Sequence, residues 1–477
     1  MGIVLIALPM VLALVAFVVP SNRWRPLVLP VTGTAHLVLT IAFLIHPEVT
    51  LALDWLALDA LGKLILLCVS VLFFLCSFYA VGYLKHSMQR SNRVFVPCMA
   101  GFLGVLSLVV QARHLGLLWV AIEATTLVTA PLVYFNRTKL SIEATWKYLL
   151  VGSVGIALAL LGTFFLAFSA TEGGLPASLS LDDLLRFGPH LSQPWLRAAF
   201  ILLLVGYGTK MGLAPMHSWK PDTYGESPGV VGALFAGGVT SVAFLALLRV
   251  YQIMVVAGDA AFASQLLLGM GLLSMAVAGV FMIGQKDLKR MLAYSSVEHM
   301  GILVLGLGIG KPALFGTLLH VVNNCATKGV LFLSVGNLQR AYGSKSITEV
   351  KGALRRLPIS GSLFLAGFLA ITGSPPFAPF VSEFSILGGA MDGRMYWVAG
   401  LFLVLLLVVF LGMGKTVLTA VQGTIPPAAK ETPYHDHFLT AAPILVFMAL
   451  VLVLGLGIPQ PLTALIGDAV FALEHPL

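Results

Sequence analysis

The sequence predicts an all-α polytopic membrane protein that crosses the bilayer about fourteen times. Hydrophobic residues make up 58% of the chain and charged residues only 10%, whereas a soluble domain is about 25% charged. Apolar runs of roughly 18–25 residues, the length that crosses a bilayer, recur throughout the chain. Two of these runs are interrupted by prolines, which is typical of membrane proteins that carry ions. An ordinary soluble protein is therefore excluded.

The expected spans follow one another with short connections. The first apolar run lacks a basic segment and a clear cleavage motif, so we interpret it as a retained helix rather than a signal peptide. The longest connection, about 171–196, is too short for a soluble domain, and the four cysteines lack paired metal spacing. We therefore expect no cofactor and no metal site in this chain. The spans lie near residues 2–20, 27–45, 60–84, 95–112, 114–134, 143–170, 197–216, 228–257, 262–284, 291–309, 313–338, 358–391, 397–422 and 439–458.

Basic residues segregate between alternate connections. Of the 28 lysines and arginines, 19 fall in one set of connections, 6 in the other and 3 within spans. The positive-inside rule then predicts that the larger set, which includes Lys220, Lys289 and Lys430, is cytoplasmic and that both termini are outside. The opposite side collects acids: Glu48, Asp54, Asp59, Glu172, Asp182, Asp183 and Asp259.

The two interrupted spans are the seventh and the twelfth. Pro215 lies in YGTKMGLAPMHSWKPDTYGESP, and Pro375, Pro376 and Pro379 lie in LAITGSPPFAPFVSEFSIL. Proline removes a backbone donor, so both helices should be unwound within the span. Paired broken segments indicate two inverted five-helix repeats. We therefore divide the chain into N-terminal helices 1–3 (1–94), a first repeat of helices 4–8 (95–257), a second repeat of helices 9–13 (258–422), and helix 14 with a tail (423–477).

Charged residues within the first repeat mark a candidate ion site. Lys210 lies about three turns into the seventh span, and a lysine at this depth costs about 2.5–3.5 kcal/mol, so it is a functional candidate. Glu123, near the middle of the fifth span, is its expected partner. His217 belongs to the polar patch that follows Pro215. The alternative for Lys210 is a lysine that reaches the interface from near a helix end.

A second set of polar residues continues the series. His320, Asn324 and Lys328 recur every four residues, which places them on one stripe of an apolar helix. Acids and bases interspersed through a bilayer predict a proton relay. Its further candidate members are Lys147, which is alternatively a surface anchor, and Glu298, His299 and Glu383; core or interface roles are expected for the lone histidines His36 and His114.

These motifs resemble one family, the antiporter-like subunits shared by respiratory complex I, Mrp-type cation/proton antiporters and membrane-bound group 4 hydrogenases. The matching pieces are WVAIEATTL, EATWKYLL, YGTKMGLAPMHSWKPDTYGESP, DLKRMLAYSSVEHMGI, LLHVVNNCATKGVLFL and PPFAPFVSEFSIL. AYSSVEHMGI and TGSPPFAPFVSEF look most like F-type subunits of hydrogenase-4. The resemblance implies that Glu123 pairs with Lys210 and that Glu383 ends a central polar axis. Ala236 and Asn324 stand where relatives often have histidines.

The resemblance implies a proton-translocating subunit of a redox-driven complex, in the inner (cytoplasmic) membrane, without a redox centre of its own. Its partners would be other membrane subunits and, through them, a peripheral redox or zinc-bearing arm. Two alternatives stay open. The first is an Mrp-like Na⁺/H⁺ antiporter subunit, and the second is the membrane subunit of an inorganic-carbon uptake complex. We expect no nucleic-acid partner.

Overall fold

The computed structural model describes residues 2–46, 55–427, 429 and 432–476. Three residues used in the topology argument, Glu48, Asp54 and Lys430, lie outside this described part. Within it, the chain forms helices and three isolated β-bridges but no strand. Ten helices are long and apolar enough to cross a membrane, and three more are apolar but shorter. The prediction of an all-α polytopic membrane protein is confirmed, whereas the count of fourteen spans, the two inverted repeats and the division into four segments stay predictions.

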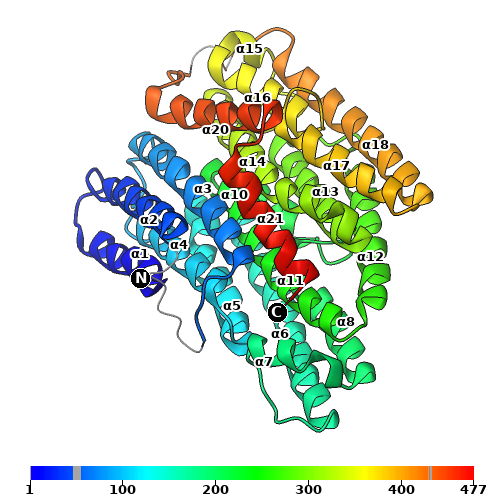
Figure 1. Ribbon diagram of the computed structural model, residues 1–477. Helices are drawn as coiled ribbons and strands as arrows, with labels where there is room; N and C mark the ends of the chain where they lie inside the picture. Colours follow the sequence, from blue (N-terminus) through cyan, green and yellow to red (C-terminus); the bar gives the residue numbers. More distant parts are fainter. Residues whose placement is uncertain (1, 47–54, 428, 430–431, 477) are drawn as a thin grey trace.

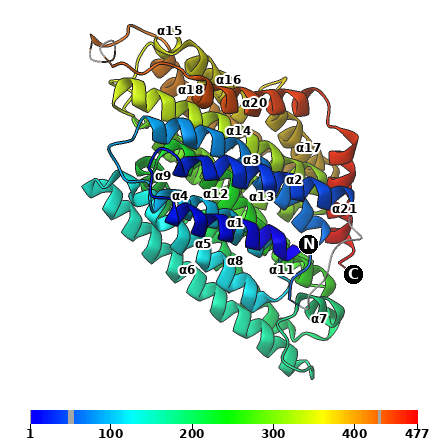
Figure 2. The same ribbon diagram turned by 90° about the vertical axis from the view of Figure 1, so that its left-hand side faces the viewer.

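The N-terminal helices form one flank of the molecule, which faces the viewer in Figure 2. Asp59 starts α3 because its side chain accepts a hydrogen bond from the backbone N–H of Gly62 at 2.7 Å, a standard N-cap. The first 3₁₀ turn, at Arg25, is fixed by hydrogen bonds from its guanidinium to Asn92 and Val19. The helices of this flank are α1 (Gly2–Val18), α2 (Val28–Ile45), α3 (Ala60–Lys85) and α4 (Phe95–Gln111).

The next group carries the first break. The seventh span is not continuous: α8 ends at Met211, and the chain becomes helical again only at Trp219. The eighth span contains a π-helical turn, which the sequence did not predict. The members are α5 (Leu115–Val133), α6 (Lys139–Glu172), the short α7 (Leu181–Arg186), α8 (Gln193–Met211), α9 (Trp219–Glu226), α10 (Gly229–Leu234), the π-helical turn η5 (Phe235–Val239) and α11 (Thr240–Val256).

The last group carries the second break, between Ile371 and Ala378. The prediction that the seventh and twelfth spans are both unwound is thus confirmed. A C-terminal helix, α21, follows the last predicted span and packs on α3. The members are α12 (Ala260–Met282), α13 (Leu288–Ile309), α14 (Leu314–Tyr342), the short α15 (Ala353–Arg356), α16 (Pro358–Ile371), α17 (Ala378–Asp392), α18 (Tyr396–Val421), α20 (Phe438–Leu456) and α21 (Gln460–Glu474).

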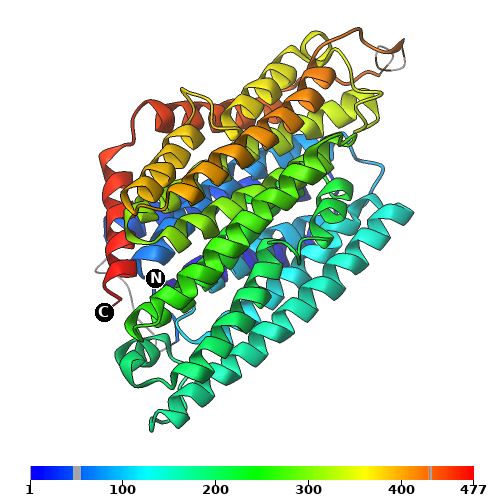
Figure 3. The same cartoon turned by 90° about the vertical axis from the view of Figure 1, so that its right-hand side faces the viewer.

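The helices run roughly side by side, with α6 at one end of the molecule and α18 at the other (Figure 1). Figure 3 shows the same order from the opposite flank, from the cyan α6 through the green helices to the orange α18. The centre is formed by α11, α13 and α14. In their most apolar stretches, 94–100% of the residues are buried, against 39% in α6. Polar side chains on the central helices are therefore enclosed by protein rather than lipid.

Candidate functional site

Lys210 is anchored near the end of α8 by hydroxyl groups. Its side chain is only 1% exposed. The ammonium donates to Thr126 Oγ1 at 2.6 Å and to Tyr148 Oη at 3.2 Å, and it lies 5.1 Å from the centre of the Tyr148 ring. Lys210 therefore lies in the protein interior, where an ammonium depends on these few oxygen atoms for its solvation.

The expected partner, Glu123, reaches Lys210 through an intermediary. No carboxylate of the described residues lies within 4 Å of the Lys210 ammonium. Instead, Thr126 Oγ1 donates to Glu123 Oε2 at 3.3 Å and accepts from Lys210. Ser153 donates to the other carboxylate oxygen at 2.7 Å. Glu123 and Lys210 are thus connected through the Thr126 hydroxyl rather than directly. A rotation of the Thr126 side chain would break both of its hydrogen bonds, to Glu123 and to Lys210.

Lys147 lies apart from this series. Its side chain is 46% exposed, and its ammonium contacts Glu143 at 2.6 Å and Asp222 at 2.8 Å. Asp222 also pairs with Arg290 at the start of α13. Lys147 therefore belongs to a partly exposed ion network that links α6, α9 and α13.

His217 lies in the break itself and is partly buried. Its ring lies 6.2 Å from the rings of Phe281 and Tyr294, and its Nδ1 atom is buried without a hydrogen-bond partner among the described residues. The structure therefore does not join His217 to Lys210 by any hydrogen bond that it describes.

Lys220 is a buried cation that the sequence analysis assigned to a connection. Its side chain is fully buried, and its ammonium donates to the carbonyl of Met211 at 2.6 Å and of Ser296 at 3.3 Å. The Met211 carbonyl is one of those left without a partner where α8 ends, and a cation is favoured at this negative end of the helix. Gly212 has φ +77°, and a Cβ atom there would lie 2.5 Å from Lys220 Cδ. The sequence analysis assigned residue 220 to a connection because the apolar run stops near Pro215. The chain becomes helical again at Trp219, inside the protein, and this second helical segment is what buries Lys220.

Lys328 lies on α14, one of the central helices, and shares a neighbouring segment of α13 with Lys220. It is fully buried and donates to Ser295 Oγ at 2.7 Å. Because Ser295 precedes Ser296, whose carbonyl accepts from Lys220, one short segment of α13 contacts both ammonium groups. The predicted stripe of α14 is present: His320, Asn324 and Lys328 are all fully buried.

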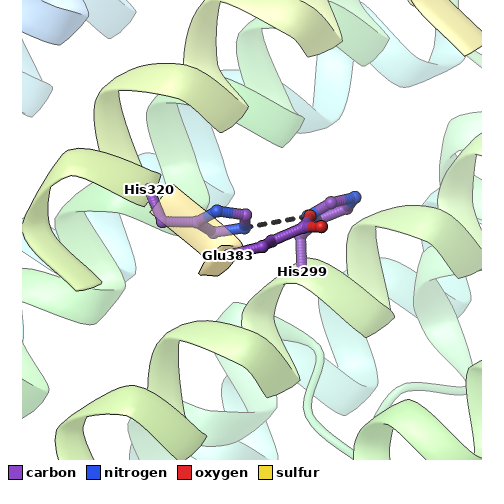
Figure 4. Close-up of side chains that lie close together, drawn as sticks. All are labelled: His299, His320 and Glu383. Atoms are coloured by element: carbon purple, nitrogen blue, oxygen red, sulfur yellow. Dashed lines mark hydrogen bonds between the residues drawn. The ribbon is translucent and has the colours of Figure 1, made fainter. Parts of the chain in front are cut away.

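A histidine pair and a glutamate form the other end of the series. Figure 4 shows His299 and His320 with Glu383 beside them. His299 Nδ1 and His320 Nε2 share a hydrogen bond of 2.9 Å, and His320 Nδ1 is 2.9 Å from Ser382 Oγ. Ligand-type atoms of His299, His320 and Glu383 all lie within 4.8 Å of one another. Both ring nitrogens of His320 are thus engaged, so a proton taken up on one nitrogen can be given up from the other.

Three oxygen atoms near this cluster have no hydrogen-bond donor among the described residues. They are Glu298 Oε2, Asn323 Oδ1 and Glu383 Oε1, and all three are buried. Glu298 Oε2 lies 3.8 Å from His299 Nε2, beyond hydrogen-bond distance. Glu383 lies against Gly373, which has φ +68° and leaves no room for a Cβ atom beside the carboxylate. Buried polar atoms of this kind need water or an ion as a partner.

The two positions that depart from the family pattern touch each other. Asn324 Nδ2 donates to the carbonyl of Ala236 at 3.3 Å. Ala236 lies in the π-helical turn η5, where the helical hydrogen-bond ladder is irregular, and its carbonyl also accepts from Thr240 Oγ1 at 2.7 Å. An amide therefore links α14 to the eighth span at the point where relatives often have histidines.

His36 and His114 lie away from this series. His36 is fully buried between Ser70 and Ser107, at 3.0 and 2.8 Å, and His114 stacks on Trp55 at 4.6 Å. Both therefore make packing contacts, as expected.

The fold and the buried cations together define an antiporter-like membrane subunit. The chain belongs to the family described as NADH:quinone oxidoreductase/Mrp antiporter, transmembrane, whose model matches residues 112–409. It is 34% identical over 412 residues to a hydrogenase-4 component F homolog of Methylacidiphilum infernorum, which covers 84% of this chain and 85% of the relative.

Solved structures share the fold. A chain of respiratory complex I from Thermus thermophilus superposes with a TM-score of 0.77 and 27% identity, over 96% of this chain and 97% of that one. A chain of the Mrp complex from Dietzia sp. superposes with a TM-score of 0.87 and 21% identity, over 99% and 97% of the two chains. These neighbours are chains of multisubunit membrane complexes, so other membrane subunits are the expected partners of this multi-pass protein.

Proposed function

We propose that this subunit moves protons along the buried series of Lys210, Lys220, Lys328, His299, His320 and Glu383. The observation that supports this most is the alternation of ammonium, hydroxyl, imidazole and carboxyl groups through the enclosed centre of the molecule. Among the described residues, each ammonium contacts only neutral oxygen atoms within hydrogen-bond distance. A buried cation without an adjacent counter-ion is poorly stabilised, so a change of charge nearby can release its proton.

Glu123 and Glu298 would adjust this series by their charge. Glu123 acts on Lys210 through Thr126, so movement of Thr126 would weaken the link and favour proton release. Lys147 would act only indirectly, because it lies in the partly exposed network with Asp222. His217 would contribute where the break admits water. Energy for the transport would come from a peripheral redox arm held by partner subunits in the inner membrane.

The test is proton transport by the intact complex in sealed vesicles. Lys328→Met removes the central ammonium and keeps the bulk of an apolar helix residue. Lys311→Met is the matched control, because Lys311 is 75% exposed and pairs with Glu474 outside the series. We expect Lys328→Met to abolish most proton uptake while the complex still assembles, and Lys311→Met to leave uptake unchanged. Normal uptake with Lys328→Met in an assembled complex would contradict the proposal.

A second candidate function is Na⁺ transport by an Mrp-like subunit. The three unpartnered oxygens of Glu298, Asn323 and Glu383 favour it, because hard cations prefer carboxylate and carbonyl oxygens. Uptake of ²²Na⁺ that is coupled to proton release and is lost in Asn323→Leu would support this second function. Proton uptake that is the same with Na⁺ and with choline would exclude it.

The composition of the complex separates these functions from inorganic-carbon uptake. Mass spectrometry of the complex, purified in mild detergent, should show hydrogenase or other redox subunits for the favoured function. Several small Mrp-type membrane proteins would indicate the second, and a large zinc protein alone would indicate inorganic-carbon uptake.

A further inference from the structure

A polar cavity of about 520 Å³ opens where α3 ends, on the face that carries the larger set of basic residues. Its walls come from α3 with the segment after it, from the start of α10 and from the end of α14, three helices that contact one another. The labels of α3, α10 and α14 lie together in Figure 1. None of the series proposed to carry protons lines this cavity. We call it the basic pocket, and its basic residues are Lys85, His86, Arg90 and Arg340.

The basic pocket has cations but no counter-ion. No Asp or Glu is among its lining residues. Neither Arg90 nor Arg340 has a carboxylate of the described residues within 4 Å. Such a concentration of one sign of charge raises the local concentration of the opposite sign. The cavity is therefore suited to an anion.

Arg340 is held in place with one end of its guanidinium unused. Nη2 donates to the carbonyl of Tyr83 at 2.6 Å and to Ser87 Oγ at 3.2 Å, and the guanidinium lies 4.0 Å from the centre of the Tyr83 ring. Nη1 is buried and has no hydrogen-bond partner among the described residues. Arg340 therefore brings a fixed positive charge to the wall of the basic pocket, and guanidinium groups pair well with phosphate.

His86 lines the basic pocket beside its cations. Burial lowers the pKa of His86 below its ordinary value, and the charges of Arg340, His437 and Lys85 lower it further. The side chain is therefore neutral at pH 7, and an anion bound beside it would favour its protonated form.

An apolar annex adjoins the basic pocket. A second cavity of about 280 Å³ shares Gln89 and Arg90 with it. Apart from Arg137, this annex is lined mainly by apolar and aromatic side chains: Val94, Phe95, Pro131, Tyr134 and Phe135. A charged chamber beside an apolar one matches an amphiphile with a phosphate group and hydrocarbon next to it. Basic pockets between membrane helices commonly hold such lipid headgroups.

We propose that the basic pocket binds the phosphate group of an anionic phospholipid from the adjacent leaflet. Lys85 would contact the phosphate and the fixed charge of Arg340 would stabilise it. Arg90 would lie between headgroup and glycerol, and the annex would receive the start of an acyl chain. A bound lipid would add a further link between the ends of α3, α10 and α14, beside the hydrogen bonds that Tyr79 and Arg340 already make between α3 and α14.

The test is lipid retention by the purified protein, measured by native mass spectrometry after exchange into phosphatidylglycerol or into zwitterionic phosphatidylethanolamine. The triple variant Lys85→Gln, Arg90→Gln, Arg340→Gln removes three charges. The control Arg23→Gln, Lys139→Gln, Arg355→Gln removes three exposed charges from the same face. Wild type and control should retain phosphatidylglycerol in preference to phosphatidylethanolamine. The triple variant should bind it on the order of 100-fold more weakly.

Two further measurements keep the result decisive. Lys85→Gln, Arg90→Gln leaves the Arg340 contacts intact, so a loss of about tenfold or more with an unchanged melting temperature would exclude misfolding as the cause. Inorganic phosphate is the second probe. Displacement of the lipid by millimolar phosphate would assign the pocket to a free anion and overturn the lipid proposal. Equal lipid retention by the triple variant and by its control would also overturn the proposal.

Discussion

The two broken helices solve the same structural problem with opposite charges. In the first break, Gly212 at φ +77° lies against the ammonium-bearing side chain of Lys220, at the carbonyl end of α8. In the second, Gly373 at φ +68° lies against the carboxylate of Glu383, which belongs to the second turn of α17. A cation such as that of Lys220 is favoured at the C-terminus of a helix. Each break thus places a glycine where a charged group must approach the backbone.

The surroundings of the two breaks differ more than their geometry. Lys210, near the first break, is linked through Thr126 to Glu123, whose other partner, Ser153, is exposed on the side of the molecule. The histidine pair near the second break is fully buried. The first site is therefore coupled to a face that another membrane subunit can cover. The second depends on its internal hydrogen bonds, so the two halves should respond differently to substitution.

The largest effect is expected for Lys210→Met in the first site. The change removes the ammonium that Thr126 and Tyr148 contact and keeps the apolar bulk, so the complex should assemble. Proton uptake in vesicles should fall by tenfold or more. Lys210→Arg should not restore it, because arginine does not release its proton. Unimpaired uptake with Lys210→Met would remove Lys210 from the proton-carrying series. It would favour the alternative in which Lys210 only reaches the membrane interface from near a helix end.

His320→Gln addresses the second site. Glutamine retains a polar side chain but cannot pass a proton from His299 towards Ser382. Positioned acid–base groups contribute about 10²–10⁴-fold to proton-transfer rates, and water can replace part of this, so we expect about a tenfold loss of uptake. His36→Gln is the matched control, since His36 is also buried between two polar groups but lies in α2. An equal loss in both variants would point to a general structural effect.

Gly212→Ala and Gly373→Ala test whether the breaks are equivalent. Each adds a Cβ atom in a left-handed conformation, which costs roughly 1–2 kcal/mol, and each pushes the charged side chain away. Both melting temperatures should fall, and uptake should fall several-fold. Gly269→Ala is the control, because a Cβ atom there meets open space within α12. A fall for one glycine alone would show that only that break needs the close approach.

The smallest effect is expected for Lys147→Gln. Lys147 is 46% exposed, and exposed ion pairs contribute about 0–1 kcal/mol to stability. Proton uptake should change by less than about twofold, and the loss should shrink further at high salt, which screens such pairs. A loss as large as that of Lys210→Met would move Lys147 into the proton-carrying series.

The sequence by itself determined the class of protein, the two breaks and the members of the proposed proton-carrying series other than Lys220. These follow from local properties: apolar length, the missing donor of proline, and the four-residue spacing of His320, Asn324 and Lys328. Each of these patterns can be recognised from residues that lie close together in the sequence.

Only the tertiary structure decided which of these residues meet. It moved Lys220 from an expected connection into the interior, because α9 resumes inside the protein after the break. It placed Thr126 between Glu123 and Lys210, left Lys147 at an edge, and brought Asn324 to the carbonyl of Ala236. Contacts of this kind depend on how helices distant in sequence pack and how a broken helix restarts, and neither is encoded in the periodicity of a single segment.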